Sequence, residues 1–156
     1  ANSALGKTEE DFYCAIASSF MLSADNAHAV HPHHPQKTDA TNCVYMNEGI
    51  VVKSHAGQKY TSDAVSVAVF KDLCKKANVP VQFFANRSDE AGGSTLGNIA
   101  MAQVSMNSVD IGLPQLAMHS TYETAGIKDT YYMIQVMTEF FNCHISEINT
   151  NVLKVD

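Results

Sequence analysis

Two patterns of apolar and polar residues follow one another along the chain: segments with apolar residues at helical spacing, and short continuous apolar runs. Thr8 followed by three acidic residues is a typical helix start, and apolar positions continue at helical spacing from Phe12 to Phe20. Further helices are expected at about 62–78, directly after the glycine-rich turn 92–97, and over about 130–141. The last of these places five large apolar side chains on one face: Met133, Val136, Met137, Phe140 and Phe141.

Short runs rich in β-branched and aromatic residues predict strands between these helices. They cover 20–24, 49–53, 81–85 and 108–112; the first ends at Asp25 and the last is closed by Pro114. Strands that alternate with helices are typical of an α/β fold with a mainly parallel central sheet. The segment 31–42 is expected to be a loop, and the tail after residue 141 fits no single type.

The composition is that of one ordinary globular domain. A chain of 156 residues with 46% hydrophobic and 17% charged positions can build a core of its own. The net charge of −6 and the lack of a basic stripe argue against nucleic acid as a partner. No apolar run approaches the roughly 20 residues of a membrane span, so a membrane is not expected as a partner either.

The four cysteines form no C-x-x-C pair: they are Cys14, Cys43, Cys74 and Cys143. This spacing gives neither a zinc knuckle nor a thioredoxin-like motif. Scattered thiols are typical of a reducing compartment, and a cytoplasmic location is therefore expected. Each cysteine is expected to be a small buried hydrophobic residue rather than a reactive one.

The segment from His28 to His34 holds four histidines in seven positions, which suggests a metal site by count alone. Pro32 and Pro35 exclude a helix that would set two imidazoles on one face. Neighbouring His33 and His34 also point to opposite sides of an extended chain. A solvated loop is the favoured interpretation for these two residues.

Two other residues stand at the carboxyl ends of predicted strands, where open α/β sheets bind their ligands. Asp25 follows the run 20–24, although a turn or helix cap explains it equally well. His119 follows the run 108–112, and a lone histidine there is more often structural. Convergence of the two would favour a functional site. Gly92-Gly93 fits a plain turn better than a phosphate loop, because no P-loop lysine follows.

Five sequence blocks follow one another along the chain: S-A-D-N-A-H-A-V-H-P at 23–32, G-I-V-V-K at 49–53 with Q-K-Y at 58–60, N-R-S-D at 86–89 with G-S-T at 93–95, V-D-I-G at 109–112, and P-Q-L-A-M-H-S at 114–120. In this order they resemble the aspartyl aminopeptidase / aminopeptidase I family of dizinc metallopeptidases. The resemblance extends over almost the whole chain, from about Leu5 to Phe141.

The resemblance implies a three-layer αβα fold of the zinc-peptidase kind and a zinc-dependent aminopeptidase that acts on peptides. Complete subunits of the family hold two Zn²⁺; Asp25 matches a ligand of one ion and His119 a ligand of the other. Asp25, His28, Lys53 and Tyr60 match positions that contact the substrate. The lysine is associated with a pocket for an acidic first residue, Asp or Glu.

Family members are much longer than this chain, so residues 1–156 match the carboxyl-terminal third. The family's remaining zinc ligands, its general-base glutamate and its inserted dimerisation domain have no counterpart here, and the catalytic base is unknown within this chain. The isolated chain is therefore expected to be inactive. Relatives form homo-oligomers, dodecamers among them. The alternative is a non-catalytic module for folding or assembly.

Overall fold

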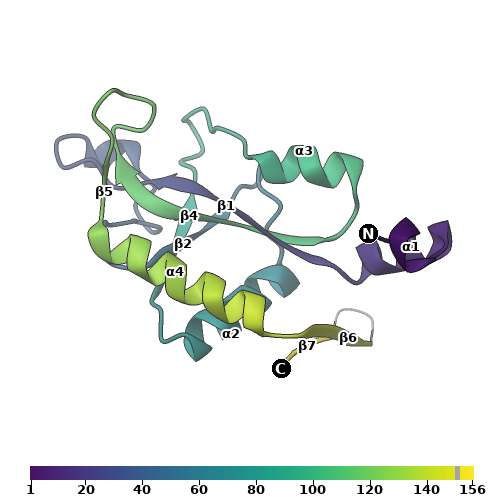
Figure 1. Cartoon of the computed structure of the whole chain (residues 1–156). Helices are drawn as coiled ribbons and strands as arrows, with labels where there is room; N and C mark the ends of the chain where they lie inside the picture. Colours follow the sequence, from purple (N-terminus) through teal and green to yellow (C-terminus); the bar gives the residue numbers. More distant parts are fainter. Residues whose placement is uncertain (150–151) are drawn as a thin grey trace.

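The computed structural model describes residues 1–149 and 152–156, in which five strands form one sheet with helices on both faces (Figure 1). The helices are α1 (Glu9–Ala17), α2 (Ala64–Lys76), α3 (Leu96–Gln103) and α4 (Ile127–Asn142), with short 3₁₀ turns at Ser3–Leu5 and Pro35–Lys37. The sheet strands are β1 (Phe20–His28), β2 (Ile50–Ser54), β3 (Val81–Ala85), β4 (Asn107–Leu116) and β5 (Thr124–Ala125). The tail forms a separate hairpin of β6 (Ile145–Asn149) and β7 (Val152–Val155).

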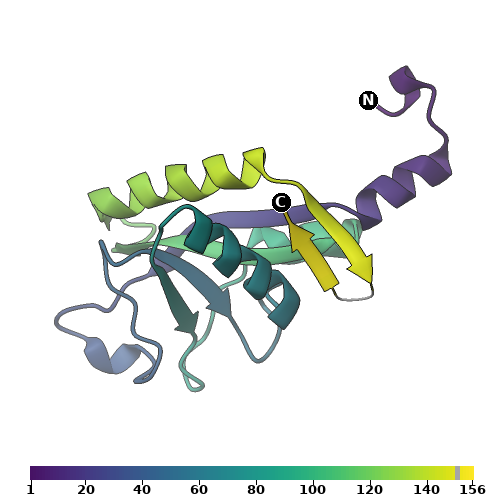
Figure 2. The ribbon, with the colours of Figure 1, turned by 90° about the horizontal axis from the view of Figure 1, so that it is seen from below.

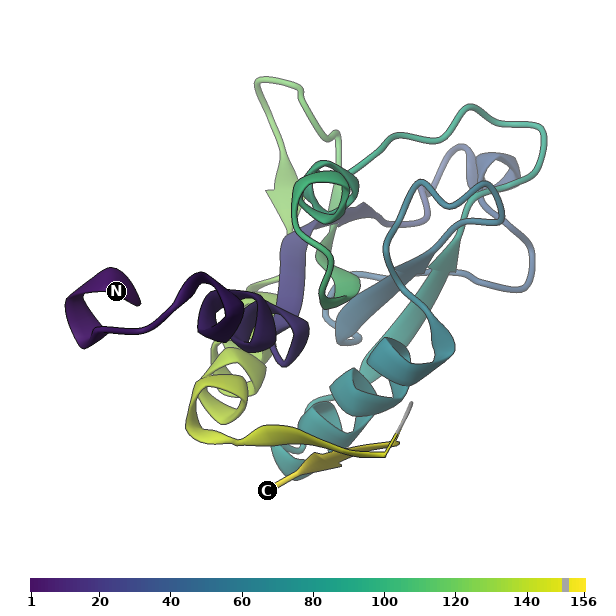
Figure 3. The same ribbon diagram turned by 90° about the vertical axis from the view of Figure 1, so that its right-hand side faces the viewer.

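The layers follow the three-layer expectation: α2 and α4 cover one face of the sheet and α3 covers the other (Figures 2 and 3). The larger core lies between the sheet and the α2–α4 layer. Its buried members are Ile50, Val52, Val69, Phe70, Leu73, Cys74, Val79, Val109, Ile111 and Val136. A smaller cluster of Ala27, Val44, Val51 and Phe84 lies on the opposite face, with Tyr60 packed against it. This second face carries the candidate site.

The sheet has the order β1-β4-β2-β3 and contains two parallel pairs that run in opposite directions. β1 and β4 are parallel over nine residue pairs, from Phe20 opposite Asn107 to His28 opposite Gln115. β2 and β3 are also parallel, but β2 meets β4 antiparallel through Val51–Gly112 and Val52–Ile111. The sheet is therefore mainly parallel, as predicted, yet the carboxyl ends of its strands lie at two edges.

Two strands are longer than the sequence predicts. β1 continues to His28, so Asp25 lies inside the strand and not just beyond it, because pairing with β4 continues from Gly112 to Gln115. β4 passes through Pro114 and ends at Leu116. Proline lacks the N–H that a ladder needs. In the described chain β2 pairs with β4 only at Ile111 and Gly112, so beyond Gly112 Pro114 interrupts no bond to β2.

The helices begin close to their predicted caps. Thr8 and Asp63 each close a capping box, with Asp11 and Ser66 as the respective partners. α1 stops at Ala17, so Phe20 belongs to β1 and not to the helix. α4 begins at Ile127, three residues before the predicted start, and Phe141 is 75% exposed instead of lying on the buried face.

The cysteines do not share one environment. Cys74 is buried in the larger core, and this burial raises the pKa of its thiol to about 12, as expected for an inert thiol. Cys14 is exposed on α1, which contradicts the expectation that every cysteine is buried. Separately, none of the helices described in residues 1–149 and 152–156 is both long and apolar enough to span a membrane.

The start of β2 is held by a buried carboxylate at the start of α4. Asp129 is fully buried and accepts hydrogen bonds from the backbone N–H groups of Asn47 and Gly49, over 2.5 and 3.0 Å. Gly49 has φ +116°, and a Cβ there would lie 2.2 Å from the Pro80 carbonyl oxygen. Only glycine therefore lets β2 start beside Pro80.

We predict that Gly49→Ala lowers the free energy of unfolding by at least about 2 kcal/mol, because it adds backbone strain to a clash with Pro80. Gly93→Ala is the matched control, since a Cβ at Gly93 has no heavy atom within 4 Å. It should change the free energy by less than about 0.5 kcal/mol. Urea unfolding of both variants measures the difference; equal stabilities would contradict this account of Gly49.

Candidate metal and substrate site

The carboxyl ends of β1 and β4 lie side by side and present Asp25, His28 and the turn that carries His119. Asp25 pairs with Gly112, and His28 pairs with Gln115, one residue before β4 ends. His119 lies three residues beyond that end, with φ +67° in the left-handed region, and its backbone N–H donates to Glu123 Oε1 over 2.6 Å. The strands that precede these residues thus end at one edge of the sheet, as predicted, although Asp25 lies inside β1 and not beyond its end.

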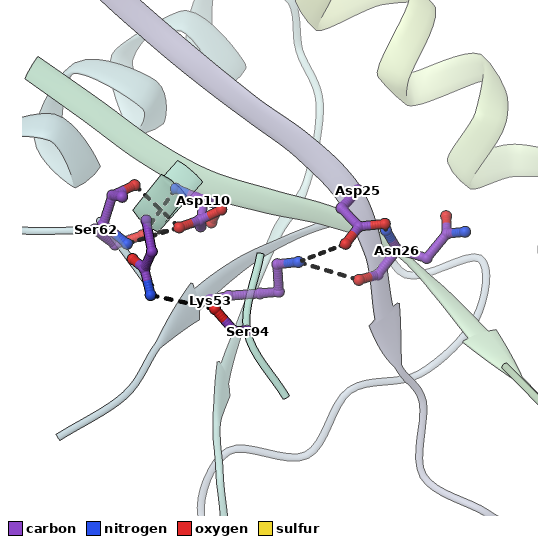
Figure 4. A network of polar contacts seen from close by, with 8 residues as sticks. Asp25, Asn26, Lys53, Ser62, Ser94 and Asp110 are labelled. Carbon is purple, nitrogen blue, oxygen red and sulfur yellow. Dashed lines mark hydrogen bonds and ion pairs between the residues drawn. The ribbon is translucent and has the colours of Figure 1, made fainter. Parts of the chain in front are cut away.

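Lys53 reaches the same place from the antiparallel strand β2. The residue is only 3% exposed, and its ammonium donates to the Asn26 carbonyl oxygen over 3.2 Å (Figure 4). Nζ also lies 3.8 Å from Asp25 Oδ2. Burial lowers the pKa of Lys53, while the carboxylates of Asp25 and Asp110 act in the opposite direction. The result is a cation inside the protein, bordered by the exposed Asp25 carboxylate.

The aromatic ring of Tyr60 lies beside the Lys53 ammonium. Lys53 Nζ lies 5.3 Å from the centre of the Tyr60 ring, a distance at which cation and ring attract each other. The ring also meets Phe84 edge-on, with centroids 6.4 Å apart, and His55 at 6.0 Å. Burial and the nearby Asp110 and Asp25 carboxylates raise the pKa of Tyr60, so its hydroxyl stays protonated and can donate a hydrogen bond.

His28 lies close enough to His119 and Lys53 to respond to both. Partial burial lowers the pKa of His28, and electrostatic interaction with the neighbouring His119 and Lys53 acts in the same direction. The imidazole is therefore neutral near pH 7. His33 and His34, by contrast, lie exposed in the turn before the 3₁₀ segment, as the loop interpretation predicted.

The donor atoms at this edge suit a zinc ion but are too few to hold one. Asp25 is exposed over 58% of its side chain, and its Oδ1 accepts only the short hydrogen bond from Asn26 N–H, so carboxylate lone pairs remain available. Carboxylate oxygen and imidazole nitrogen are ordinary zinc ligands. Within residues 1–149 and 152–156, however, no three His, Cys, Asp or Glu side chains lie close enough to hold a metal. Further ligands would have to come from outside this chain.

Three residues of this site escaped the sequence analysis: Asn26, Thr61 and Asp110. Asn26 contributes a backbone carbonyl, for which no sequence signal exists. Thr61 adjoins Tyr60 and donates to Asp110, a contact across 49 positions of the chain. Asp110 did carry a signal, because it is an acid between Val109 and Ile111 in an apolar strand.

Comparison with known proteins supplies the family. A Clostridium novyi protein named probable M18 family aminopeptidase 2 is 52% identical over 138 residues, covering 88% of this chain and 32% of that protein. A chain in the cryo-EM structure of the Ape4 and Nbr1 complex is 37% identical with a TM-score of 0.86, covering 88% of this chain and 26% of that one. The S. cerevisiae mApe1 dodecamer follows at 26% identity and a TM-score of 0.75, over 89% of this chain and 31% of that one.

The chain thus spans about a third of the curated relatives that it matches. These relatives agree with the resemblance seen in the sequence blocks, and the solved structures agree with the α/β fold and its mainly parallel sheet. The family model for aminopeptidase I zinc metalloproteases matches residues 2–141. The chain therefore belongs to the aminopeptidase I zinc metalloprotease (M18) family.

Proposed function

We propose that this chain is the carboxyl-terminal part of a zinc-dependent aminopeptidase that removes amino-terminal residues, acidic ones among them, from peptides. The observation that carries the proposal is the buried Lys53 ammonium beside the exposed Asp25 and the ring of Tyr60. A buried cation is costly unless it is paired and hydrogen-bonded. The partners of Lys53 lie on the strand that also carries Asp25 and His28, which favours a role at the candidate site over a module that serves only folding or assembly.

Asp25 and His119 are the residues of this chain that would hold zinc, one for each of two ions in a complete subunit. When bound, zinc lowers the pKa of a water molecule and polarises the scissile carbonyl. Two ligands do not close a site, so we expect the isolated 156-residue chain to bind zinc weakly and to be inactive. The catalytic base and the remaining ligands belong to the part of the complete protein outside this chain.

Lys53, Tyr60 and His28 would receive the substrate. The Lys53 ammonium would form a charge-assisted hydrogen bond with the carboxylate of a first residue Glu or Asp. The protonated Tyr60 hydroxyl would donate to the oxygen on which charge develops during hydrolysis. The neutral His28 would lie against the bound peptide without repelling its free amino group.

The proposal includes a homo-oligomer and a cytoplasmic location. The yeast relative is described as a dodecamer, which supports self-association of the complete protein. The four cysteines described as free thiols support a reducing compartment.

Removing either proposed ligand should remove zinc. In the complete protein, Asp25→Ala and His119→Ala are each expected to lose bound zinc and nearly all aminopeptidase activity. His33→Ala and His34→Ala are the matched controls, because both imidazoles are exposed in the neighbouring turn. Mass spectrometry of native protein measures the metal content. Stoichiometric zinc in the Asp25 variant would refute its assignment as a ligand.

Lys53→Met tests the acidic pocket. We expect the ratio of kcat/KM on substrates with amino-terminal Glu to that on substrates with amino-terminal Leu to fall by about one to two orders of magnitude. This corresponds to the loss of a charged hydrogen bond of roughly 1.5–3 kcal/mol. Met keeps the length and volume of the side chain, and the exposed Asp25 is left solvated, so the free energy of unfolding should change by less than about 1.5 kcal/mol. If the ratio stays within a factor of about two of wild type, Lys53 does not set the preference.

A further inference from the structure

Asp110 is a fully buried carboxylate in β4, one position before Ile111 and Gly112, the residues that pair with β2. Its Oδ2 accepts two hydrogen bonds from Thr61, from the backbone N–H over 2.6 Å and from the hydroxyl over 3.0 Å. Ser108 Oγ lies 3.0 Å from Thr61 Oγ1. Since the Thr61 hydroxyl hydrogen is directed at Asp110, Ser108 is the donor in that contact.

Ser62, which follows Thr61 in the loop, is also hydrogen-bonded to β4. The Asp110 backbone N–H donates to Ser62 Oγ over 3.0 Å, and Ser62 Oγ lies 3.4 Å from the Asp110 carbonyl oxygen (Figure 4). On the other side of Tyr60, Lys59 Nζ donates to the Gly92 carbonyl oxygen over 2.8 Å. The backbone is therefore held directly on the carboxyl side of Tyr60, whereas on its amino side the contact is made by the Lys59 side chain.

Helix α3 packs closely against the Asp110 side chain. A Cβ at Gly97 would lie 2.9 Å from Asp110 Oδ2 and 2.9 Å from Ser23 Oγ, so α3 packs directly on the carboxylate. Asn98 of the same helix donates to the Gln58 carbonyl oxygen over 3.3 Å. The loop that carries Tyr60 is thus held between β4 and α3. Asp110 of β4 contacts both this loop and α3.

We propose that Asp110 is a positioning residue for substrate selection, which holds Tyr60 against Lys53 through its hydrogen bonds to Thr61. The inference rests on the proposed aminopeptidase function and on the role of Lys53 in it. Asp110 touches neither substrate nor metal in this scheme. It acts through Thr61, the residue directly after Tyr60, and fixes the ring 5.3 Å from the ammonium.

The test is the Glu:Leu ratio of kcat/KM in the complete protein with Asp110→Ala, which removes the acceptor for Thr61. We expect the ratio to fall about tenfold, mainly through a higher KM for the Glu-terminated substrate, with zinc content unchanged. Asp110→Asn should restore the ratio to within about twofold of wild type. Its carbonyl oxygen can accept from Thr61 while its NH₂ takes the place of Oδ1, which has no hydrogen-bond partner in the described chain.

Asp129→Ala is the matched control for a merely structural effect. Asp129 is also fully buried and also accepts two backbone N–H groups, but it lies at the other end of β2 from Lys53, roughly 13 Å along the strand. The Asp129→Ala variant should have a lower free energy of unfolding and an unchanged Glu:Leu ratio of kcat/KM. A ratio that falls equally in both variants would overturn the proposal, as would an unchanged ratio in Asp110→Ala.

If Asp110→Ala does not fold, Thr61→Val decides, since it removes the hydroxyl that contacts Asp110 and Ser108, keeps the backbone N–H bond to Asp110, and retains the shape of the side chain. A fall of threefold or more supports the proposal, and a smaller change overturns it. The wild type and Lys53→Met separate the two levels of inference. The proposed function fails if the complete wild type has no aminopeptidase activity, or if Lys53→Met leaves the Glu:Leu ratio unchanged. If the wild type is active and Lys53→Met lowers the ratio, an unchanged ratio in Asp110→Ala contradicts only the role of Asp110.

Discussion

β4 pairs with β1 in one direction and with β2 in the other, and the candidate site depends on this reversal. The parallel pairing with β1 brings the carboxyl ends of both strands together, which gathers Asp25, His28 and the turn that holds His119. The antiparallel contact with β2 lies next to Asp110, where it directs Lys53 inward beneath Asp25. In an all-parallel sheet, the carboxyl end of β2 would lie at the same edge as those of β1 and β4, and Lys53 would not meet Asp25 from the opposite direction.

The buried charges of this chain have different purposes, and their surroundings distinguish them. Asp129 accepts hydrogen bonds to both of its oxygens from a backbone turn, and its contacts are complete. Lys53 has a carbonyl, an aromatic ring and a carboxylate around it, and that carboxylate, Asp25, is itself exposed to solvent. Asp110 lies between these cases: Oδ2 accepts from Thr61, and Oδ1 has no hydrogen-bond partner within the part of the chain that the structure describes. A charge whose partners are all buried supports the fold, whereas one whose partner is exposed lies near a surface where a ligand can bind.

Local signals predicted the elements well, and the extent of each element less well. The capping hydroxyl of Thr8 and the carboxylate of Asp63 fix the helix starts, because these side chains satisfy free N–H groups wherever the helix packs. Strand ends have no such local marker. β1 continues through the polar residues Asp25 and Asn26 because β4 provides hydrogen-bond partners there, and β4 tolerates Pro114 because its pairing with β2 stops at Gly112. Similarly, Phe141 has helical spacing in the sequence, but no element of the described chain covers it.

The sequence by itself determined the class of fold, the family and the candidate residues Asp25, His28, Lys53, Tyr60 and His119, because each lies in a local block of residues that can be recognised alone. It also associated Asp25 and His119 each with the end of an apolar run, and the parallel pairing of β1 with β4 then brings those two ends to one edge. Only the tertiary structure decided that Lys53 is buried, that Tyr60 lies beside it, and that Asp110 holds the loop in place. The hydrogen bonds of Lys53 to Asn26 and of Thr61 to Asp110 join residues 27 and 49 positions apart, through a strand reversal that periodicity does not encode. Strand direction depends on which edges pair in the folded sheet, and that is a property of the whole chain.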